Sequence, residues 1–201
     1  MEDVKFDGGI NPVIIHTLAT AYDGESRIRN KYTAYAEIAQ KEGHPEVASV
    51  FLEVADNEKE HARWFLKMLN MINEMNPNVI PQSLPNLFNY RIGDTQTNLN
   101  LAIVGETLEY TTYYPEFAKL AESVGLVEIS SRVNAISIAE KHHADRFKKL
   151  LANLTPGNEL SENIYNEKTW ICRQCGYVAI GDNPPIKCPS CDCTDCFYQA
   201  S

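Results

Sequence analysis

The sequence predicts an all-α four-helix bundle followed by a small C-terminal β domain built around metal-binding knuckles. Two stretches, Glu58–Phe65 and Glu140–Phe147, both read E-K-x-H-A-x-x-F. Each lies in a segment whose apolar residues recur every three or four positions, as on one face of a helix. All six cysteines lie beyond residue 170. The chain therefore divides into a duplicated helical part and a cysteine-rich tail.

The first predicted helix begins at Pro12 and ends near Gly43, and Pro45 opens the second, because proline suits the first turn and glycine the residue after the last. Glu25 falls in line with Tyr32 on the apolar face of the first helix. The apolar seam of the second helix steps by three or four residues and includes a Glu-x-x-His pair: Val47, Phe51, Val54, Glu58, His61, Phe65, Leu69 and Ile72.

The stretch Asn76–Tyr90 contains three prolines and ends the second helix. Its length suits a crossover to a non-adjacent helix, as in ferritin-like bundles. The third helix carries Glu106, and the fourth runs out near Leu154 with Glu140 and His143 in its apolar seam. A polar linker follows. We thus expect a ferritin-like bundle over residues 1–154, a linker over 155–166 and a four-cysteine domain over 167–201.

The two halves of the bundle repeat one set of metal-ligand types. Each half offers one Glu and, 33 or 34 residues later, a Glu-x-x-His pair whose members share a helix face. Two such hairpins can hold two ions. A single Glu-x-x-His is usually an ordinary surface pair, but repetition in register favours a buried site. Buried carboxylates need a compensating charge, and no Lys or Arg shares these seams. Iron and manganese both suit this ligand set.

The halves differ in the third helix. Tyr114 follows Glu106 by eight residues, whereas Tyr32 follows Glu25 by seven. One extra residue in a helix can be absorbed as a π-bulge, a feature frequent at functional sites. The same segment carries Glu109, which has no counterpart in the first half. Glu109 is either an added ligand or a solvated side chain, and we favour the ligand.

The tail contains two C-x2-C knuckles, Cys172/Cys175 and Cys188/Cys191. About 35 residues bury too little apolar surface to fold alone, so we expect a bound ion to be part of the fold. Zinc and iron both suit four thiolates, and disulfides are the disfavoured alternative. Two further cysteines, Cys193 and Cys196, could be spare thiols, an oxidisable pair or alternative ligands.

Charge and hydropathy exclude other classes. A net charge of −9 argues against nucleic-acid binding. No apolar run approaches the ~20 residues that a membrane span needs. The segment Met1–Asp7 has neither the basic start nor the apolar core of a signal peptide, so we expect a cytoplasmic protein.

Over essentially its whole length the chain resembles the rubrerythrin family, which joins a ferritin-like di-iron bundle to a rubredoxin-like domain. The matching segments are GESRIRNKYTAYA, NEKEHARWF, GETLEYTTYYPEFA, AEKHHADRF and WICRQCGY followed by CPSC. The resemblance implies two irons in the bundle, held by Glu25, Glu58, Glu106, Glu109, Glu140 and His143, with His61 exchanging for Glu109 on one iron as the redox state changes. It also implies one iron held by Cys172, Cys175, Cys188 and Cys191, and two tyrosines that bond ligand carboxylates, Tyr32 and Tyr114.

The implied function is reduction of hydrogen peroxide to water in oxidative-stress defence, with electrons from NAD(P)H. The sequence has no G-x-G-x-x-G motif, so an external reductase should oxidise NAD(P)H. The resemblance favours a homodimer with electron relay between subunits. Alternatives are an iron buffer of the ferroxidase type, an electron-transfer protein, or a partner-binding protein with a structural zinc ribbon. One departure from the family is Asp192 in place of glycine after Cys191, and Asp tolerates the left-handed conformation better than most residues.

Overall fold

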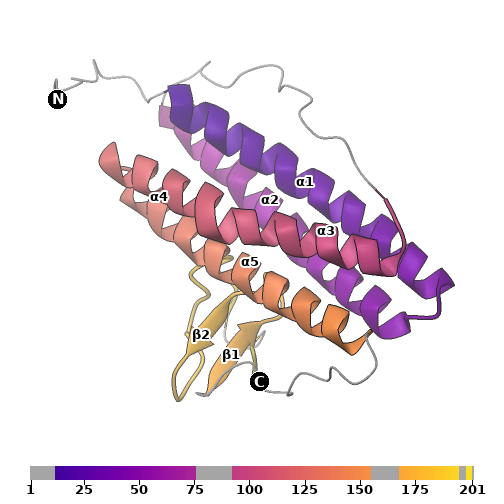
Figure 1. Cartoon of the computed structure of the whole chain (residues 1–201). Helices are drawn as coiled ribbons and strands as arrows, with labels where there is room; N and C mark the ends of the chain where they lie inside the picture. The colour runs from indigo at the N-terminus through magenta and orange to yellow at the C-terminus, as the bar shows by residue number, and fades with distance from the viewer. Residues whose placement is uncertain (1–11, 76–91, 155–167, 195–197, 201) are drawn as a thin grey trace.

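The computed structural model describes residues 12–75, 92–154, 168–194 and 198–200. In these ranges the helices are α1 (Pro12–Lys41), α2 (Pro45–Met75), α3 (Thr95–Leu108), the π-helix η1 (Glu109–Tyr113), α4 (Tyr114–Ser123) and α5 (Val127–Asn153). Because α3, η1 and α4 follow one another without a break, they form one long helix. The predicted four-helix bundle is confirmed (Figure 1). The predicted crossover over Asn76–Tyr90 and the predicted linker over 155–166 lie outside the described residues.

The bundle consists of two helical hairpins. α1 packs along α2, and α3 and α4 pack along α5 (Figure 1). Gly43 and Gly125 follow the first helix of each hairpin with φ of 83° and 80°, a conformation that glycine adopts without steric cost. Both hairpins therefore close with the same turn chemistry, as expected for duplicated halves.

Two clusters of buried apolar residues fill the two ends of the bundle. One contains Leu18, Phe65 and Ile136, and the other contains Phe51 and Phe147. Each fully buried side chain of this size contributes roughly 1.5–3 kcal/mol. On every long helix the predicted ligand residues lie between the segments that build the two clusters. Helix packing therefore fixes the polar centre from both ends.

The π-bulge predicted for the third helix is confirmed as η1. The backbone N–H of Tyr114 donates to the carbonyl of Glu109, five residues earlier. Pro115 follows at the start of α4, where a missing backbone donor is tolerated. The extra residue of this helix is thus accommodated between Glu106 and Tyr114, beside the polar centre.

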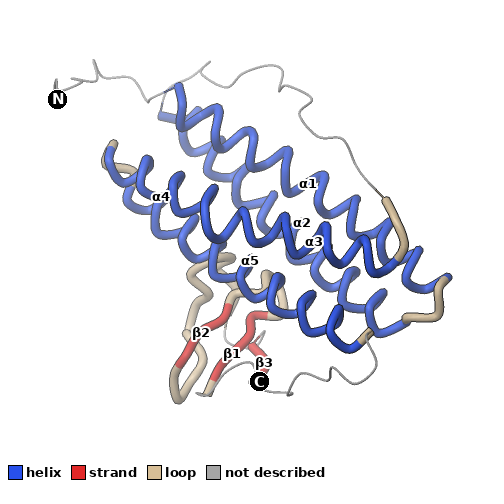
Figure 2. The backbone as a smooth tube through the Cα atoms, viewed as in Figure 1, coloured by secondary structure: helices blue, strands red, loops and turns tan. Residues whose placement is uncertain are grey.

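The C-terminal domain contains three short antiparallel strands, β1 (Thr169–Cys172), β2 (Val178–Ile180) and β3 (Tyr198–Ala200), in the order β2-β1-β3. The domain lies beside α5 (Figure 2). Trp64 of α2 belongs to the same buried cluster as the domain's cysteines. The small domain therefore shares its core with the bundle.

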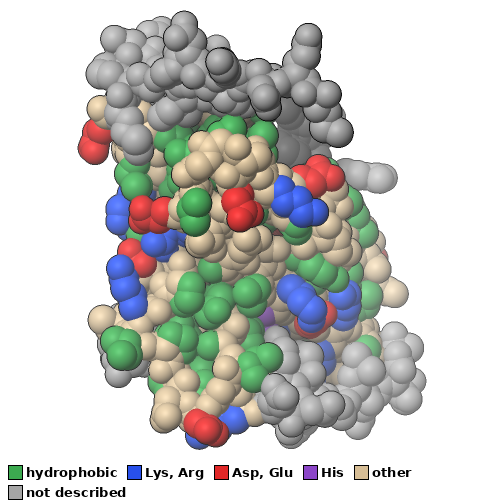
Figure 3. Space-filling view, turned by 90° about the vertical axis from the view of Figure 1, so that its left-hand side faces the viewer, with side chains coloured by type: hydrophobic (Ala, Val, Ile, Leu, Met, Phe, Trp, Pro, Cys, Tyr) green, Lys and Arg blue, Asp and Glu red, His purple; other side chains and the backbone are tan. Residues whose placement is uncertain are grey.

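Charged side chains are mixed on the face shown in Figure 3. Lys and Arg lie interspersed with Asp and Glu and with apolar residues, so this face presents no broad field of one sign. Within the described ranges, no helix combines the length and the apolar character that crossing a membrane requires.

Candidate metal centres

All four long helices contribute to one buried polar cluster. α1 supplies Glu25, α3 supplies Glu106, and α2 and α5 each supply a Glu-x-x-His pair. No member is more than 1% exposed, although ionisable side chains are almost never so buried without a partner. The structure thus brings together six of the predicted ligands: Glu25, Glu58, His61, Glu106, Glu140 and His143.

The two imidazoles hold equivalent positions. His61 Nδ1 lies 2.8 Å from Glu58 Oε2 and 2.9 Å from Glu140 Oε1. His143 Nδ1 lies 3.1 Å from Glu58 Oε1 and 2.9 Å from Glu140 Oε2. Each of these two glutamates therefore contacts both imidazoles through different oxygens. That arrangement suits a carboxylate that bridges two ions.

Two overlapping quartets of ligand atoms result. Glu25, Glu58, His61 and Glu140 lie within 4.8 Å of one another, and so do Glu58, Glu106, Glu140 and His143. The quartets share Glu58 and Glu140, and each adds one histidine and one glutamate of its own. Two ions with two common carboxylates account for this pattern.

Several ligand atoms of the cluster make no hydrogen bond of acceptable geometry, even where an imidazole nitrogen and a carboxylate oxygen lie close together. These buried atoms are Glu25 Oε2, Glu58 Oε1, Glu106 Oε2, both carboxylate oxygens of Glu140, and His143 Nδ1. Leaving buried polar atoms unsatisfied is costly. All of them belong to the two quartets, so the donor set fits a pair of carboxylate- and imidazole-binding ions.

Two tyrosines hold the outer carboxylates. Tyr32 of α1 donates its hydroxyl to Glu106 Oε1 on α3, and Tyr114 of α4 donates to Glu25 Oε1 on α1. Both bonds cross from one hairpin to the other and are related by the internal symmetry. Both tyrosines are at most 5% exposed, so each hydrogen bond restrains one buried carboxylate.

Burial and mutual repulsion shift the pKa values of the clustered carboxylates and imidazoles. Burial first, and then the charge of Glu58, raises the pKa of Glu25 well above its usual range and that of Glu106 to about 7. Burial lowers the pKa of His61, but the charges and hydrogen bonds of Glu140 and Glu58 together outweigh burial and raise the pKa well above its usual value. Protons must therefore compensate these carboxylates wherever metal ions do not.

Glu109 stands apart from the two quartets. It is the first residue of η1 and is partly exposed, and it lines a cavity of about 640 Å³ between α1 and the third helix. Lys31 and Tyr114 line the same cavity. Burial of the Glu109 carboxyl, and then the charge of Glu106, raise its pKa well above the usual range. Glu109 thus lies between the cavity and the polar cluster, close enough to sense its charges.

The outer nitrogens of the histidines connect the cluster to the C-terminal domain. His61 Nε2 lies 2.9 Å from the carbonyl oxygen of Cys175, and His143 Nε2 lies 3.2 Å from Asn57 Oδ1. Asn57 in turn donates to the carbonyl of Arg173. Hydrogen bonds of this kind orient an imidazole so that its other nitrogen faces a metal.

The first knuckle approaches the bundle closely. A Cβ at Gly176 would lie 2.3 Å from His143 Nε2. Gly176 has φ of 74°, and its counterpart in the second knuckle, Asp192, has φ of 61°. The left-handed conformation expected at Asp192 is confirmed. Because the second knuckle accepts a side chain at this position, the requirement for glycine at 176 comes mainly from contact with the bundle.

Five thiols gather in the C-terminal domain. The Sγ atoms of Cys172 and Cys191 are 3.7 Å apart, as are those of Cys175 and Cys188. All four side chains are buried, and all are free thiols. Cys193 is buried beside them. Cys196 lies outside the described residues. The cysteine cluster fits a rubredoxin-like iron site.

Sequence reasoning missed three residues that join the domains. Arg132 of α5 stacks on the Trp64 ring of α2 at 3.5 Å from its centroid. The Arg132 guanidinium also donates to the Ser190 carbonyl at 2.6 Å and lies 3.1 Å from Asp192 Oδ1. Arg132, Trp64 and Asn57 all lie off the apolar seams. For Asn57 and Trp64, the one available signal in the sequence was that each is close to a residue of the Glu58-x-x-His61 pair.

Comparisons with known proteins agree with this geometry. A model of the rubrerythrin family matches residues 16–151. The chain belongs to the rubrerythrin family. A Methanocaldococcus jannaschii protein named as a rubrerythrin is 44% identical over 183 residues, which cover 88% of this chain and 87% of that protein. Rubrerythrin-1 of Clostridium acetobutylicum is 37% identical, and the alignment covers 90% of this chain and 91% of that protein.

Solved structures bear out the fold. The structure of nigerythrin in a partially reduced state aligns with a TM-score of 0.66 and 24% identity, over 99% of this chain and 91% of that chain. Family membership makes the chain a di-iron oxidoreductase of the kind that acts in oxidative-stress defence. The carboxylate–histidine cluster and the cysteine cluster fit the two kinds of iron site that the family combines.

Proposed function

We propose that the chain is a non-haem di-iron peroxidase that reduces hydrogen peroxide to water. The main support is the pair of overlapping ligand quartets that share Glu58 and Glu140. Two ferrous ions held by these residues would supply the two electrons and the Lewis acidity that cleavage of one peroxide needs. Each turnover consumes one hydrogen peroxide, two electrons and two protons, and it releases two water molecules.

The proposed iron ligands in the bundle are Glu25, Glu58, His61, Glu106, Glu109, Glu140 and His143, and those of the C-terminal domain are Cys172, Cys175, Cys188 and Cys191. Tyr32 and Tyr114 hold the outer carboxylates by donating hydrogen bonds to them. Glu58 and Glu140 occupy the shared position. This division of roles follows the internal symmetry of the bundle.

Glu109 is the proposed mobile ligand. It lines the cavity of about 640 Å³ through which a small oxidant can approach, and η1 places it one turn beyond Glu106. We propose that its carboxylate and His61 replace one another as ligands when the redox state changes. When released, the Glu109 carboxyl can carry a proton from the cavity to the reacting oxygen.

The thiolate iron is the proposed electron donor to the bundle. Cys175 accepts a hydrogen bond from His61 through its carbonyl oxygen, at an N···O distance of 2.9 Å. His61 belongs to one of the bundle quartets. A continuous covalent and hydrogen-bonded path thus leads from the thiols to the bundle site, and it supports electron transfer in single steps.

Electrons are proposed to come from NAD(P)H through an external reductase, because the sequence offers no dinucleotide motif of its own. In the structure of the single chain the C-terminal domain contacts its own bundle. A cytoplasmic homodimer with relay between subunits stays a prediction. Mixing a Cys172→Ser chain with a Glu58→Ala chain tests it, since activity returns in mixed dimers only if electrons cross between subunits.

Stoichiometric oxidation tests the proposed function. The fully reduced, iron-loaded protein should consume one equivalent of peroxide without release of oxygen. Both iron chromophores should then need reductant before the next turnover. Protein with zinc in the knuckles and iron in the bundle is the matched control. It should complete a first turnover and then stall when electrons are supplied by the external reductase.

Two outcomes would overturn the peroxidase assignment. One is that neither iron chromophore reoxidises within the turnover time. The other is uptake of iron well beyond the two bundle ions and the one knuckle ion, which would indicate an iron buffer of the ferroxidase type.

A further inference from the structure

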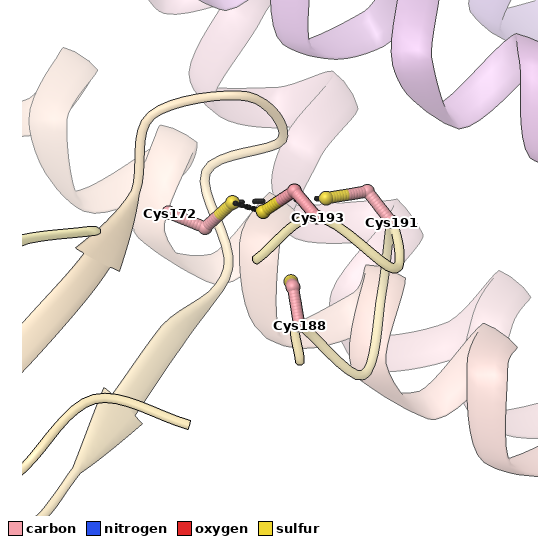
Figure 4. A group of neighbouring side chains, drawn as sticks. All are labelled: Cys172, Cys188, Cys191 and Cys193. Carbon is pink, nitrogen blue, oxygen red and sulfur yellow. Dashed lines mark hydrogen bonds between the residues drawn. The ribbon is translucent and has the colours of Figure 1, made fainter. Parts of the chain in front are cut away.

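The second knuckle carries a fifth thiol that the proposed function does not use. Cys193 is 8% exposed, and its Sγ lies 3.1 Å from that of Cys172. Figure 4 shows the two side chains pointing toward one another, Cys172 from the end of β1 and Cys193 from the loop after Cys191. The thiols of Cys172, Cys188, Cys191 and Cys193 all lie within 4.8 Å of one another. Four thiols close enough together to surround one ion therefore exist without Cys175.

The internal symmetry of the domain explains where Cys193 lies. In each knuckle the residue after the second cysteine, Gly176 or Asp192, donates its N–H to the carbonyl of the first cysteine, at 2.8 Å and 2.9 Å. The next residue then accepts from the backbone N–H of that first cysteine, at 2.8 Å in both knuckles. This residue is Tyr177 in the first knuckle and Cys193 in the second. A thiol thus stands where the symmetric position has a phenol.

The sulfur spacing separates resting ligands from the extra thiol. A metal–sulfur length of about 2.3 Å puts the sulfurs of a tetrahedral site roughly 3.8 Å apart. The pairs Cys172/Cys191 and Cys175/Cys188, both at 3.7 Å, meet this spacing. Cys193 is closer to Cys172 than two bound ligands would be. The 3.1 Å contact instead suits a hydrogen bond between the two sulfurs, in which Cys193 is the donor when Cys172 binds the ion as a thiolate.

We propose that Cys193 is a reserve ligand of the knuckle site, able to replace Cys175 in binding a thiolate-preferring transition ion such as iron or zinc. In the exchange the proton of Cys193 passes to the Cys175 sulfur, so the site keeps four thiolates and its net charge. The exchange therefore buries no additional anion, and burying one would cost free energy. The reserve role presupposes the thiolate metal site proposed above and adds a second way of completing it.

Cys175 can leave the metal without undocking the domain. Its contact with the bundle uses the carbonyl oxygen, which accepts from His61 Nε2, and not the thiol. The remaining three ligands, Cys172, Cys188 and Cys191, belong to both sets. Cys175 is therefore the one position in the predicted ligand set that the reserve thiol can cover.

Serine substitutions in the full-length chain test the inference. After expression with iron, Cys175→Ser should keep one knuckle iron, with a shifted ferric-thiolate absorption. The double variant Cys175→Ser/Cys193→Ser should lose that iron. Cys175→Ser/Cys196→Ser is the matched control, because it removes the same number of thiols and should keep the iron. Iron per chain and visible absorption are the readouts, and the helical circular dichroism of the bundle reports folding.

A second measurement leaves all four predicted knuckle ligands in place. Transfer of knuckle iron to a strong chelator should be severalfold faster in Cys193→Ser than in the wild type, because a thiolate that dissociates can no longer be replaced. Equal transfer rates would overturn the reserve role. So would a Cys175→Ser protein without knuckle iron, or one whose iron survives the added loss of Cys193. If the wild type itself holds no knuckle iron, the proposed function fails instead.

Discussion

The two metal centres of this chain are built alike but supported differently. Each combines two copies of a small unit, a helical hairpin in the bundle and a C-x2-C knuckle in the C-terminal domain. Each departs from its symmetry at one chemically active residue, Glu109 in the bundle and Cys193 in the knuckles. The bundle centre lies between two large apolar clusters, whereas the cluster in the small domain consists of cysteines and Trp64. Packing therefore positions the carboxylates, whereas we expect the thiolates to depend on a bound ion for their arrangement.

Removal of all metal should affect the two regions most unequally. A structural ion contributes on the order of 10 kcal/mol to small thiolate domains, while the apolar clusters hold the bundle. After chelation under reducing conditions, amide protection in β1 and β2 should vanish, and the helical circular dichroism should persist. Loss of both signals at the same chelator concentration would show that the bundle also depends on metal for its fold.

Loss of a shared carboxylate should abolish the bundle centre without affecting the knuckles. Glu58→Ala and Glu140→Ala each remove a ligand from both quartets. Their effect on iron binding should exceed the roughly 10–100-fold loss typical of residues that only orient a ligand. By symmetry the two variants should behave alike. Iron analysis and knuckle absorption check this, and retention of two bundle irons by either variant would refute the bridging role.

Docking between the regions should depend on Gly176. A Cβ there would lie 2.3 Å from His143 Nε2, and overpacking of this kind costs about 1–3 kcal/mol. Gly176→Ala should therefore slow the reoxidation of the knuckle iron by about 10–100-fold. Gly125→Ala is the control, since Gly125 also has positive φ but has no atom within 4 Å of an added Cβ. Equal rates of knuckle-iron reoxidation in the two variants would show that electron transfer does not depend on this contact between the domains.

Removal of either tyrosine hydroxyl should weaken iron binding in the bundle without abolishing it. Tyr32→Phe keeps the ring, which packs at 5.3 Å from Phe147, but it removes the hydrogen bond to Glu106. A hydrogen bond to a charged group contributes about 1.5–3 kcal/mol, so iron affinity should fall by about 10–100-fold. Tyr114→Phe should match it in iron titrations. A large difference between the two would show that the halves are not equivalent.

The sequence was sufficient to predict the bundle, the π-bulge and the cluster of carboxylates and histidines. These follow from helical periodicity, which places Glu58 and His61 on one face with Phe65, and from repetition in register. The contacts between regions were not predictable. They depend on Gly176, Asn57 and Arg132, which meet partners from another domain, and no periodic pattern carries that information. The single-residue difference between the halves predicted where η1 forms, but not that Glu109 lines a cavity.

The order in which the bundle irons and the thiolate iron lose electrons distinguishes the role of the oxidant-binding centre from that of the electron donor. The fully reduced protein is mixed anaerobically with one equivalent of peroxide, and the two iron chromophores are followed in one experiment. The bundle irons should oxidise first, and the ferric-thiolate absorption should then appear as the thiolate iron returns one electron to the bundle. Thiolate iron that oxidises first, while the bundle stays ferrous, would contradict this order.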